Sequence, residues 1–245
     1  MALIINAKPK SNIHDSGYFR LCSNELIASL LQACHATVIS NGTELEKFIR
    51  KYSIYKIVEK KEKMKKDGTP YASPQYVKGT EPTFDTVIEY YNNNKNAYFP
   101  KIRISRECLE QVGIKLSSKK NIELDGVWVK DGKIYVTEIK EGAALDTKKS
   151  DGEIKMFKLL SELFNYYNVN PDFFIVLWNL NDINDASIKS IEAVDYIITG
   201  ADFSKIVKLD FIKLNKERQS DALINEKYII EEMREIVKEY DETNS

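Results

Sequence analysis

The stretch that decides the fold is ELDGVWVKDGKIYVTEIKEG, residues 123–142. Apolar residues alternate along it on both sides of Asp131-Gly132, a pattern that predicts two strands joined by a type I′ turn. With those two residues as the turn, Asp125 faces Glu138 directly across the hairpin. Lys140 lies on the same face, because side chains alternate along a strand. The stretch therefore predicts a hairpin with a cluster of charges at one end.

The charged cluster belongs to a hairpin whose two faces are both largely apolar, as in the centre of a sheet. Opposed carboxylates destabilise a strand pair, and partial burial raises that cost unless a cation is present. Oxygen ligands beside one ammonium, with no His or Cys nearby, favour Mg²⁺ or Mn²⁺. The alternative is an ordinary ion pair between Glu123 and Lys140, with the two acids at a wet end of the sheet.

The rest of the chain alternates helical and strand patterns around this hairpin. Ser150 and Glu153 have the form of a capping box that opens a helix. The other expected elements are helices over 23–36, 42–52, 84–92, 185–192 and 217–240, strands over 173–180 and near 195–200, and an exposed basic loop or insertion over 59–82. This order predicts an α/β (α+β) fold with a mixed β-sheet flanked by helices. We expect a single domain over 1–245.

Composition excludes several classes of protein. With 43% hydrophobic and 30% charged residues, the chain has an ordinary globular composition. Its longest apolar runs are far shorter than the roughly 18 residues of a membrane span, so we expect a cytoplasmic protein with no membrane partner. Three cysteines without a close pair indicate no disulfide framework. Because His14 and His35 are the only histidines, a histidine-based nuclease is disfavoured.

Asp125 in ELDG, with Glu138 and Lys140 in TEIKEG, resembles the motif of the PD-(D/E)xK nuclease superfamily, and within it the type II restriction endonucleases. Leu124 stands where the motif has a proline, a position that varies widely in such enzymes. The resemblance covers a core of about residues 120–180. It implies a restriction-endonuclease-like core, with Asp125 and Glu138 as ligands of Mg²⁺, for which Mn²⁺ substitutes. Lys140 would contact the phosphate and the attacking water, with a role as general base left open.

The resemblance also implies a glutamate on a helix before the hairpin. Glu46 fits, between Leu45 and Ile49, and Glu44 is a close rival; a solvated helix flank is the alternative for both. The implied activity is hydrolysis of double-stranded DNA at a specific site. Because one active site cuts one strand, we expect a homodimer.

Clusters of basic residues are candidates for contacts with DNA phosphates, although such runs are usually solvated faces. They are Lys60, Lys61, Lys63, Lys65 and Lys66; Lys101, Arg103 and Arg106; and Lys148 with Lys149. Two rival functions stay open. One is a structure-specific repair nuclease or junction resolvase with the same core, and the other is a non-catalytic DNA-binding protein.

Overall fold

The computed structural model describes residues 27–28, 30–31, 44–69, 75, 77–114, 121–142, 144–145, 147–185, 187–188 and 191–243. Their contacts group the chain into two compact units, and each is described by itself. One comprises Met1–Ile49 with Ile212–Ser245, and the other Arg50–Phe211. Most of the helix expected over 23–36 lies outside the described residues. The expectation of a single domain stays a prediction.

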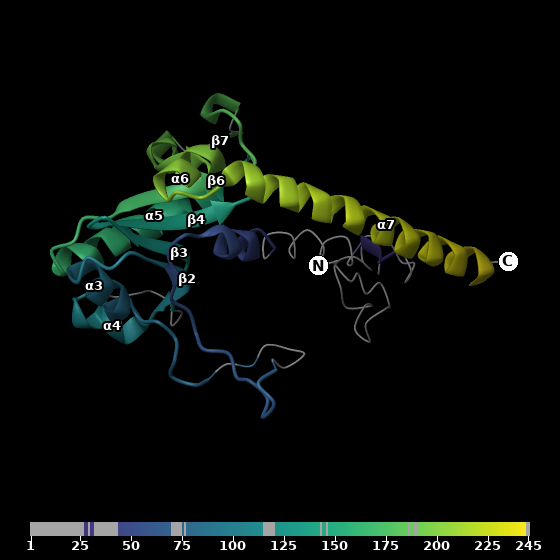
Figure 1. Ribbon diagram of the computed structural model, residues 1–245. Helices are drawn as coiled ribbons and strands as arrows, with labels where there is room; N and C mark the ends of the chain where they lie inside the picture. Colours follow the sequence, from purple (N-terminus) through teal and green to yellow (C-terminus); the bar gives the residue numbers. More distant parts are fainter. Residues whose placement is uncertain are drawn as a thin grey trace. The chain divides into compact units, whose positions relative to one another are not determined.

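The second unit is built on a mixed sheet (Figure 1). Its strand order is β1 (Lys56–Ile57), β2 (Ala97–Ile104), β3 (Ile122–Lys130), β4 (Lys133–Lys140), β6 (Asp172–Leu177) and β8 (Ile197–Thr199). The β2, β3 and β4 strands are antiparallel to their neighbours in that group. The remaining pairs, β1 with β2, β4 with β6 and β6 with β8, are parallel. The predicted α/β class with a mixed sheet is confirmed.

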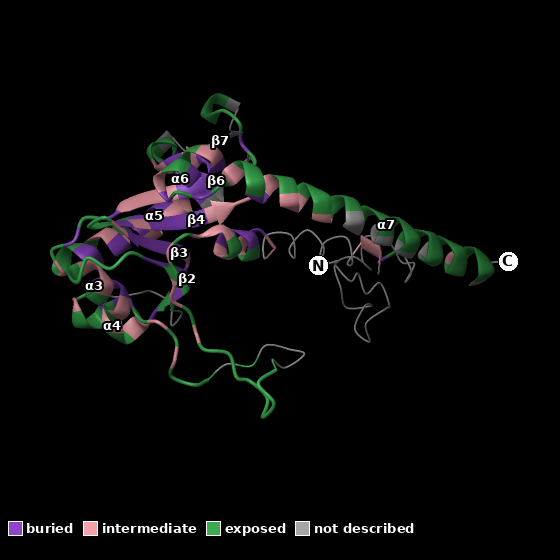
Figure 2. Cartoon of the chain, in the orientation of Figure 1, coloured by how far each residue is buried: buried purple, intermediate pink, exposed green. Residues whose placement is uncertain are grey.

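The central hairpin has the predicted register. Val127 pairs with Val136 and Lys130 with Lys133, which leaves Asp131 and Gly132 as the turn. Both turn residues have positive φ angles, 51° and 75°, as a type I′ turn requires. Figure 2 shows β3 and β4 largely buried, which agrees with their place in the middle of the sheet.

Helices cover both faces of the sheet: α3 (Phe84–Asn92), α4 (Arg106–Gln111), α5 (Thr147–Tyr166) and α6 (Gly200–Ile206). Phe173 of β6 stacks on Phe157 of α5 at 5.0 Å, whereas its neighbour Phe174 faces Phe203 of α6 at 6.1 Å between ring centroids. Because successive strand residues point to opposite faces, α5 and α6 lie on opposite sides of the sheet. On the α5 side, α3 packs its Phe84 against Phe164.

Several elements differ from the sequence-based expectations. The β2 and α4 segments were not predicted; β2 contains Pro100, and proline is rare inside paired strands. The helix expected over 185–192 is replaced by two 3₁₀ turns, Ile183–Asp185 and Ile191–Tyr196, with β7 (Ser187–Ile188) between them. That short strand pairs with β5 (Ala144–Leu145), and pairing between distant segments overrides the local helical pattern.

The capping box at Ser150 is also wrong. The α5 helix begins at Thr147, so Ser150 lies inside it and is fully buried.

Three further expectations are confirmed. A helix covers residues 44–52, with Leu45 and Ile49 buried, and α3 has the predicted bounds. The C-terminal helix α7 (Phe211–Thr243) includes all of 217–240.

The loop predicted over 59–82 is exposed along most of its described length. Its two sides exchange backbone hydrogen bonds: the amide of Lys63 donates to the carbonyl of Gln75 at 2.6 Å, and Val77 donates to Lys61 at 2.8 Å. The described part of the loop is therefore a paired arm.

Among the described residues, none of the helices combines the length and apolar character needed to cross a membrane.

Gly200 starts α6 against the backbone of Trp178. A Cβ at this position would lie 2.5 Å from the Trp178 carbonyl oxygen. Since this backbone cannot move without disturbing β6, we expect Gly200→Ala to lower the free energy of unfolding by about 1–3 kcal/mol. Thermal denaturation would then show a loss of about 2–4 °C for each kcal/mol.

Gly152 provides the matched control. It lies within α5, and nothing would contact a Cβ there within 4 Å. Because alanine is the better helix former, Gly152→Ala should stabilise the protein by about 0.5–1 kcal/mol. A Gly200→Ala variant that melts at or above the wild-type temperature would contradict the close approach at Trp178.

Candidate active site

The candidate site lies where β3 and β4 separate. The paired residues of the hairpin end at Gly126 and Thr137, although both strands continue beyond them. Past this point the backbone N–H of Ile139 donates to Oδ2 of Asp125 at 3.0 Å. A side-chain carboxylate thus replaces the carbonyl that would otherwise continue the ladder. Asp125 is thereby held against the backbone next to Glu138.

Gly126 and Thr137 close the hairpin just before the strands separate. A Cβ on Gly126 would lie 2.6 Å from the Trp128 ring and 2.9 Å from Oγ1 of Thr137. The same Thr137 hydroxyl donates to the Gly126 carbonyl at 3.1 Å. Only glycine leaves room for this arrangement, which explains why it directly follows the site aspartate. This close contact between Gly126 and Thr137 marks the point where the strands separate and the carboxylates begin.

Glu138 is a buried carboxyl among charged neighbours, with only 8% of the residue exposed. Burial raises the pKa of Glu138 and the nearby Asp125 raises it further, to about 8, against the opposing effect of Lys140. Lys140 contacts Oε1 of Glu138 directly. Burial lowers the pKa of Lys140, but Glu138, Glu153 and Asp125 outweigh it and the net shift is upward. The site therefore gathers three carboxyl groups around one ammonium.

Glu153 is a member of this cluster that the sequence patterns missed. It projects from α5, and its Oε1 lies 3.3 Å from Nζ of Lys140. Its side chain is only 18% exposed. The capping-box pattern assigned this carboxylate to the helix N-terminus, whereas it contacts Lys140. The usable signal was its position in the second turn of the helix that follows the hairpin.

The donor set fits Mg²⁺. Among the described residues no three Asp, Glu, His or Cys side chains gather closely enough to form a metal cage. Mg²⁺ does not require one, because it is usually bound through one or two carboxylates and keeps several waters. Asp125 and Glu138 supply two such carboxylates, and burial together with the nearby Asp125 raises the pKa of Glu138. A divalent cation between them would relieve their repulsion.

The other predicted site residues fall in several places. Glu123 pairs with Arg103 at 3.1 Å, so the alternative of a Glu123–Lys140 pair is wrong. Lys65 and Lys66 are exposed on the arm over 59–82. Lys148 and Lys149 lie in the first turn of α5, and their side chains are outside the described part of the structure. Their contacts with DNA stay a prediction.

Glu46 and Glu44 lie on the helix over 44–52, whose residues up to Ile49 belong to the first compact unit. Glu46 is partly buried, whereas Glu44 pairs with Lys47 on the following turn. Because Asp125 and Glu138 belong to the second unit, participation of either glutamate in the site stays a prediction.

Comparison with known proteins shows a similarity that reaches beyond the hairpin. No family model matches the chain, and no solved structure matches it. The chain is 29% identical to the type II restriction enzyme HhaII of Haemophilus parahaemolyticus over 242 residues, which cover 96% of this chain and 95% of that protein. The similarity therefore includes the segments outside the core of about 120–180. It supports a restriction-endonuclease-like relationship for the chain as a whole.

Proposed function

We propose that this protein is a Mg²⁺-dependent type II restriction endonuclease that hydrolyses phosphodiester bonds of double-stranded DNA at a specific site. The observation that carries the proposal is the convergence of Asp125, Glu138 and Lys140 where β3 and β4 separate. The full-length similarity to a type II restriction enzyme supports it independently of the motif.

Each residue has a role that follows from its surroundings. Asp125 and Glu138 would hold Mg²⁺, which when bound lowers the pKa of a coordinated water and withdraws charge from the scissile phosphate. Lys140 keeps its ammonium, because the surrounding carboxylates raise its pKa. It therefore offers a positive charge to the phosphate oxygens as negative charge develops there. Glu153 orients Lys140 from the side of α5.

We expect Asp125→Ala, Glu138→Ala and Lys140→Ala each to lower the rate of DNA cleavage at least about 100-fold, because each removes a group that stabilises the reacting phosphate or its metal. The measurement is cleavage of phage DNA with Mg²⁺, alongside circular dichroism to establish that each variant folds. Full activity in any of the three would sink the assignment. Lys158→Ala, at an exposed pair with Glu192, is the control and should cleave normally.

The pattern of products tests site specificity. A restriction endonuclease cuts unmodified plasmid DNA into discrete fragments, and sequencing of their ends shows one common sequence. A repair nuclease or junction resolvase of the same fold would instead select branched or damaged DNA. A nonspecific smear, or cleavage of branched DNA alone, would favour the alternative function over ours.

Mg²⁺ should also stabilise the folded protein without any DNA. At tenfold saturation a single bound ion contributes about 1.4 kcal/mol, which for a chain of this size raises the melting temperature by about 3–6 °C. Glu138→Gln removes one ligand charge and the repulsion with Asp125. We expect this variant to melt above the wild type in EDTA and to gain less from Mg²⁺. Equal Mg²⁺ shifts in both proteins would argue against a metal at Glu138.

Cleavage of both strands at a symmetric site needs two active sites, so we propose a homodimer on DNA. Analytical ultracentrifugation of the protein with a duplex that contains its site should give the mass of two chains. A single chain on a fully cleavable duplex would rule out this arrangement.

A further inference from the structure

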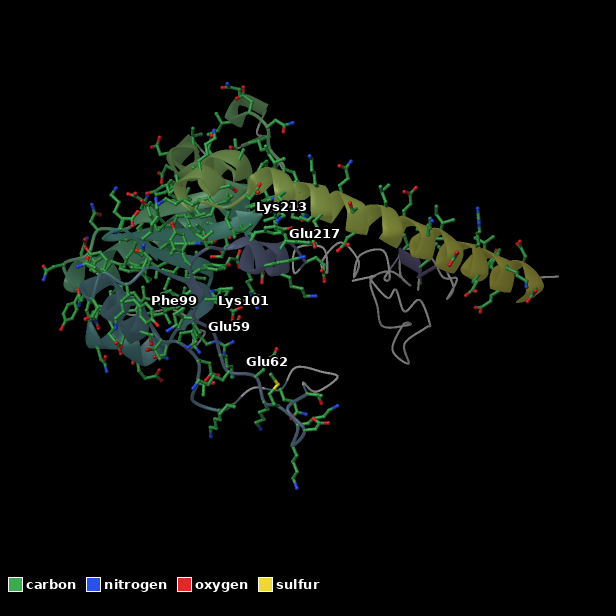
Figure 3. All side chains as sticks on the ribbon, in the orientation of Figure 1. Glu59, Glu62, Phe99, Lys101, Lys213 and Glu217 are labelled. Carbon is green, nitrogen blue, oxygen red and sulfur yellow. The ribbon has the colours of Figure 1, made fainter. Side chains whose placement is uncertain are left out.

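A cleft of about 410 Å³ opens beside β2 and is lined by Glu123 of the neighbouring strand β3. Four cationic side chains line it: Arg50, Lys60, Lys101 and Arg103. Its walls come from segments far apart in the sequence, namely the start of the arm at 59–60, the approach to α3 at 81–83, and β2 itself. The labelled Lys101 and Glu59 lie close together where these segments meet (Figure 3).

Three of these cations are paired with carboxylates that also line the cleft. Arg50 pairs with Glu59 at 3.1 Å, Arg103 pairs with Glu123 at 3.1 Å, and Lys60 pairs with Glu81. The three carboxylate side chains are 48–53% exposed. Ion pairs this exposed are weak and readily exchange one anion for another. The cleft is thus a row of cations whose anionic partners can be replaced.

The row of cations leads to the catalytic residues through the sheet. Pro100 pairs with Gly126 and Ile102 with Leu124, so Lys101 lies across from Asp125 in the register of β2 and β3. Neighbouring strands are about 4.8 Å apart. Glu123, which lines the cleft, lies two residues before Asp125 on β3. The cleft therefore borders the part of β2 and β3 that carries Asp125.

Lys101 has a backbone conformation that is unusual for a lysine within a strand, with φ of 56°. Residues other than glycine, asparagine and aspartate rarely adopt the left-handed region, and such strain gathers at functional sites. Pro100 on one side and buried Ile102 on the other keep the strand in its register. The strain places a cation at the rim of the cleft where glycine would be the relaxed choice.

We propose that this cleft binds the DNA backbone next to the phosphate that is cut, and that Glu59, Glu81 and Glu123 occupy its cations in the DNA-free protein. This rests on the proposed function, since it takes the DNA strand at the active site as the partner. Phosphates replace the three carboxylates, which are then left facing the DNA and oppose binding. The carboxylates therefore weaken the affinity for DNA of any sequence, while the cations supply it.

The cations are tested by the salt dependence of binding. The probe is a short mixed-sequence duplex in EDTA, followed by fluorescence anisotropy. The salt slope is the slope of log affinity against log salt concentration, and each lost phosphate contact lowers its magnitude by about 0.9. Between about 50 and 200 mM salt, the affinity of Arg103→Ala or Lys60→Ala should therefore fall by a factor about 3.5 times smaller than that of the wild type. Lys158→Ala, taken from an ion pair of similar exposure outside the cleft, should keep the wild-type slope. Wild-type slopes in both cleft variants would overturn the proposal.

The carboxylates are tested by a change in the opposite direction. Glu81→Gln and Glu123→Gln free a cation without removing it, so each should strengthen binding by about 1.5- to 5-fold. Glu192→Gln, the partner of Lys158, should leave the affinity unchanged. If the two cleft variants bind no better than Glu192→Gln, the carboxylates do not compete with phosphate and the proposal fails.

Lys101→Gly separates a role in binding from a role in the fold. Glycine relaxes the left-handed backbone, so the variant should melt at a higher temperature than the wild type. It should nevertheless bind DNA more weakly and with a lower salt slope. An unchanged affinity would exclude Lys101 from the DNA path. If the wild type cuts DNA while every cleft variant binds DNA normally, the proposed role of the cleft is wrong and the proposed function stands. If the wild type cuts no DNA, the proposed function itself fails.

Discussion

The structure depends on one hydrogen bond, from the backbone N–H of Ile139 to the carboxylate of Asp125. It lies where two central strands stop pairing, so a side chain satisfies a partly buried backbone donor. The same hydrogen bond fixes the orientation of the Asp125 carboxylate, beside the buried pair Val127 and Val136. A carboxylate held this way needs no other support, and the neighbouring Glu138 follows from the alternation of β4.

The electrostatics of the site follow from that geometry. Burial raises the pKa of Glu138, and the nearby carboxylates Asp125 and Glu153 raise it further against the opposing effect of Lys140. A group of charges that destabilises the isolated protein is the expected state of a site arranged for a cation and a phosphate. The α5 helix completes the site because its buried face packs on the same side of the sheet.

The site and the cleft border each other in the register of β2 and β3. Asp125 on β3 and Lys101 on β2 are neighbours in register, so acids dominate one side of this boundary and cations the other. The acids suit a metal and the reacting phosphate, whereas the cations suit the phosphates that flank it. The carboxylates that cover those cations would limit binding to DNA in general, and thereby leave more of the discrimination to contacts with bases.

The sequence by itself determined the hairpin, its turn and the juxtaposition of Asp125, Glu138 and Lys140. These depend on contacts between near neighbours: Asp-Gly sets the turn, and alternation then assigns every side chain to a face. The course of β2, the role of Glu153 and the cleft were decided only by the tertiary structure. The proline at position 100 argues against a strand in the local pattern, and that pattern cannot show that β2 pairs with β3. Glu153 looked like a capping residue because local signals could not include the packing that buries Ser150 and brings α5 to Lys140. Contacts between distant segments have no local signature, and for that reason the full site required the fold.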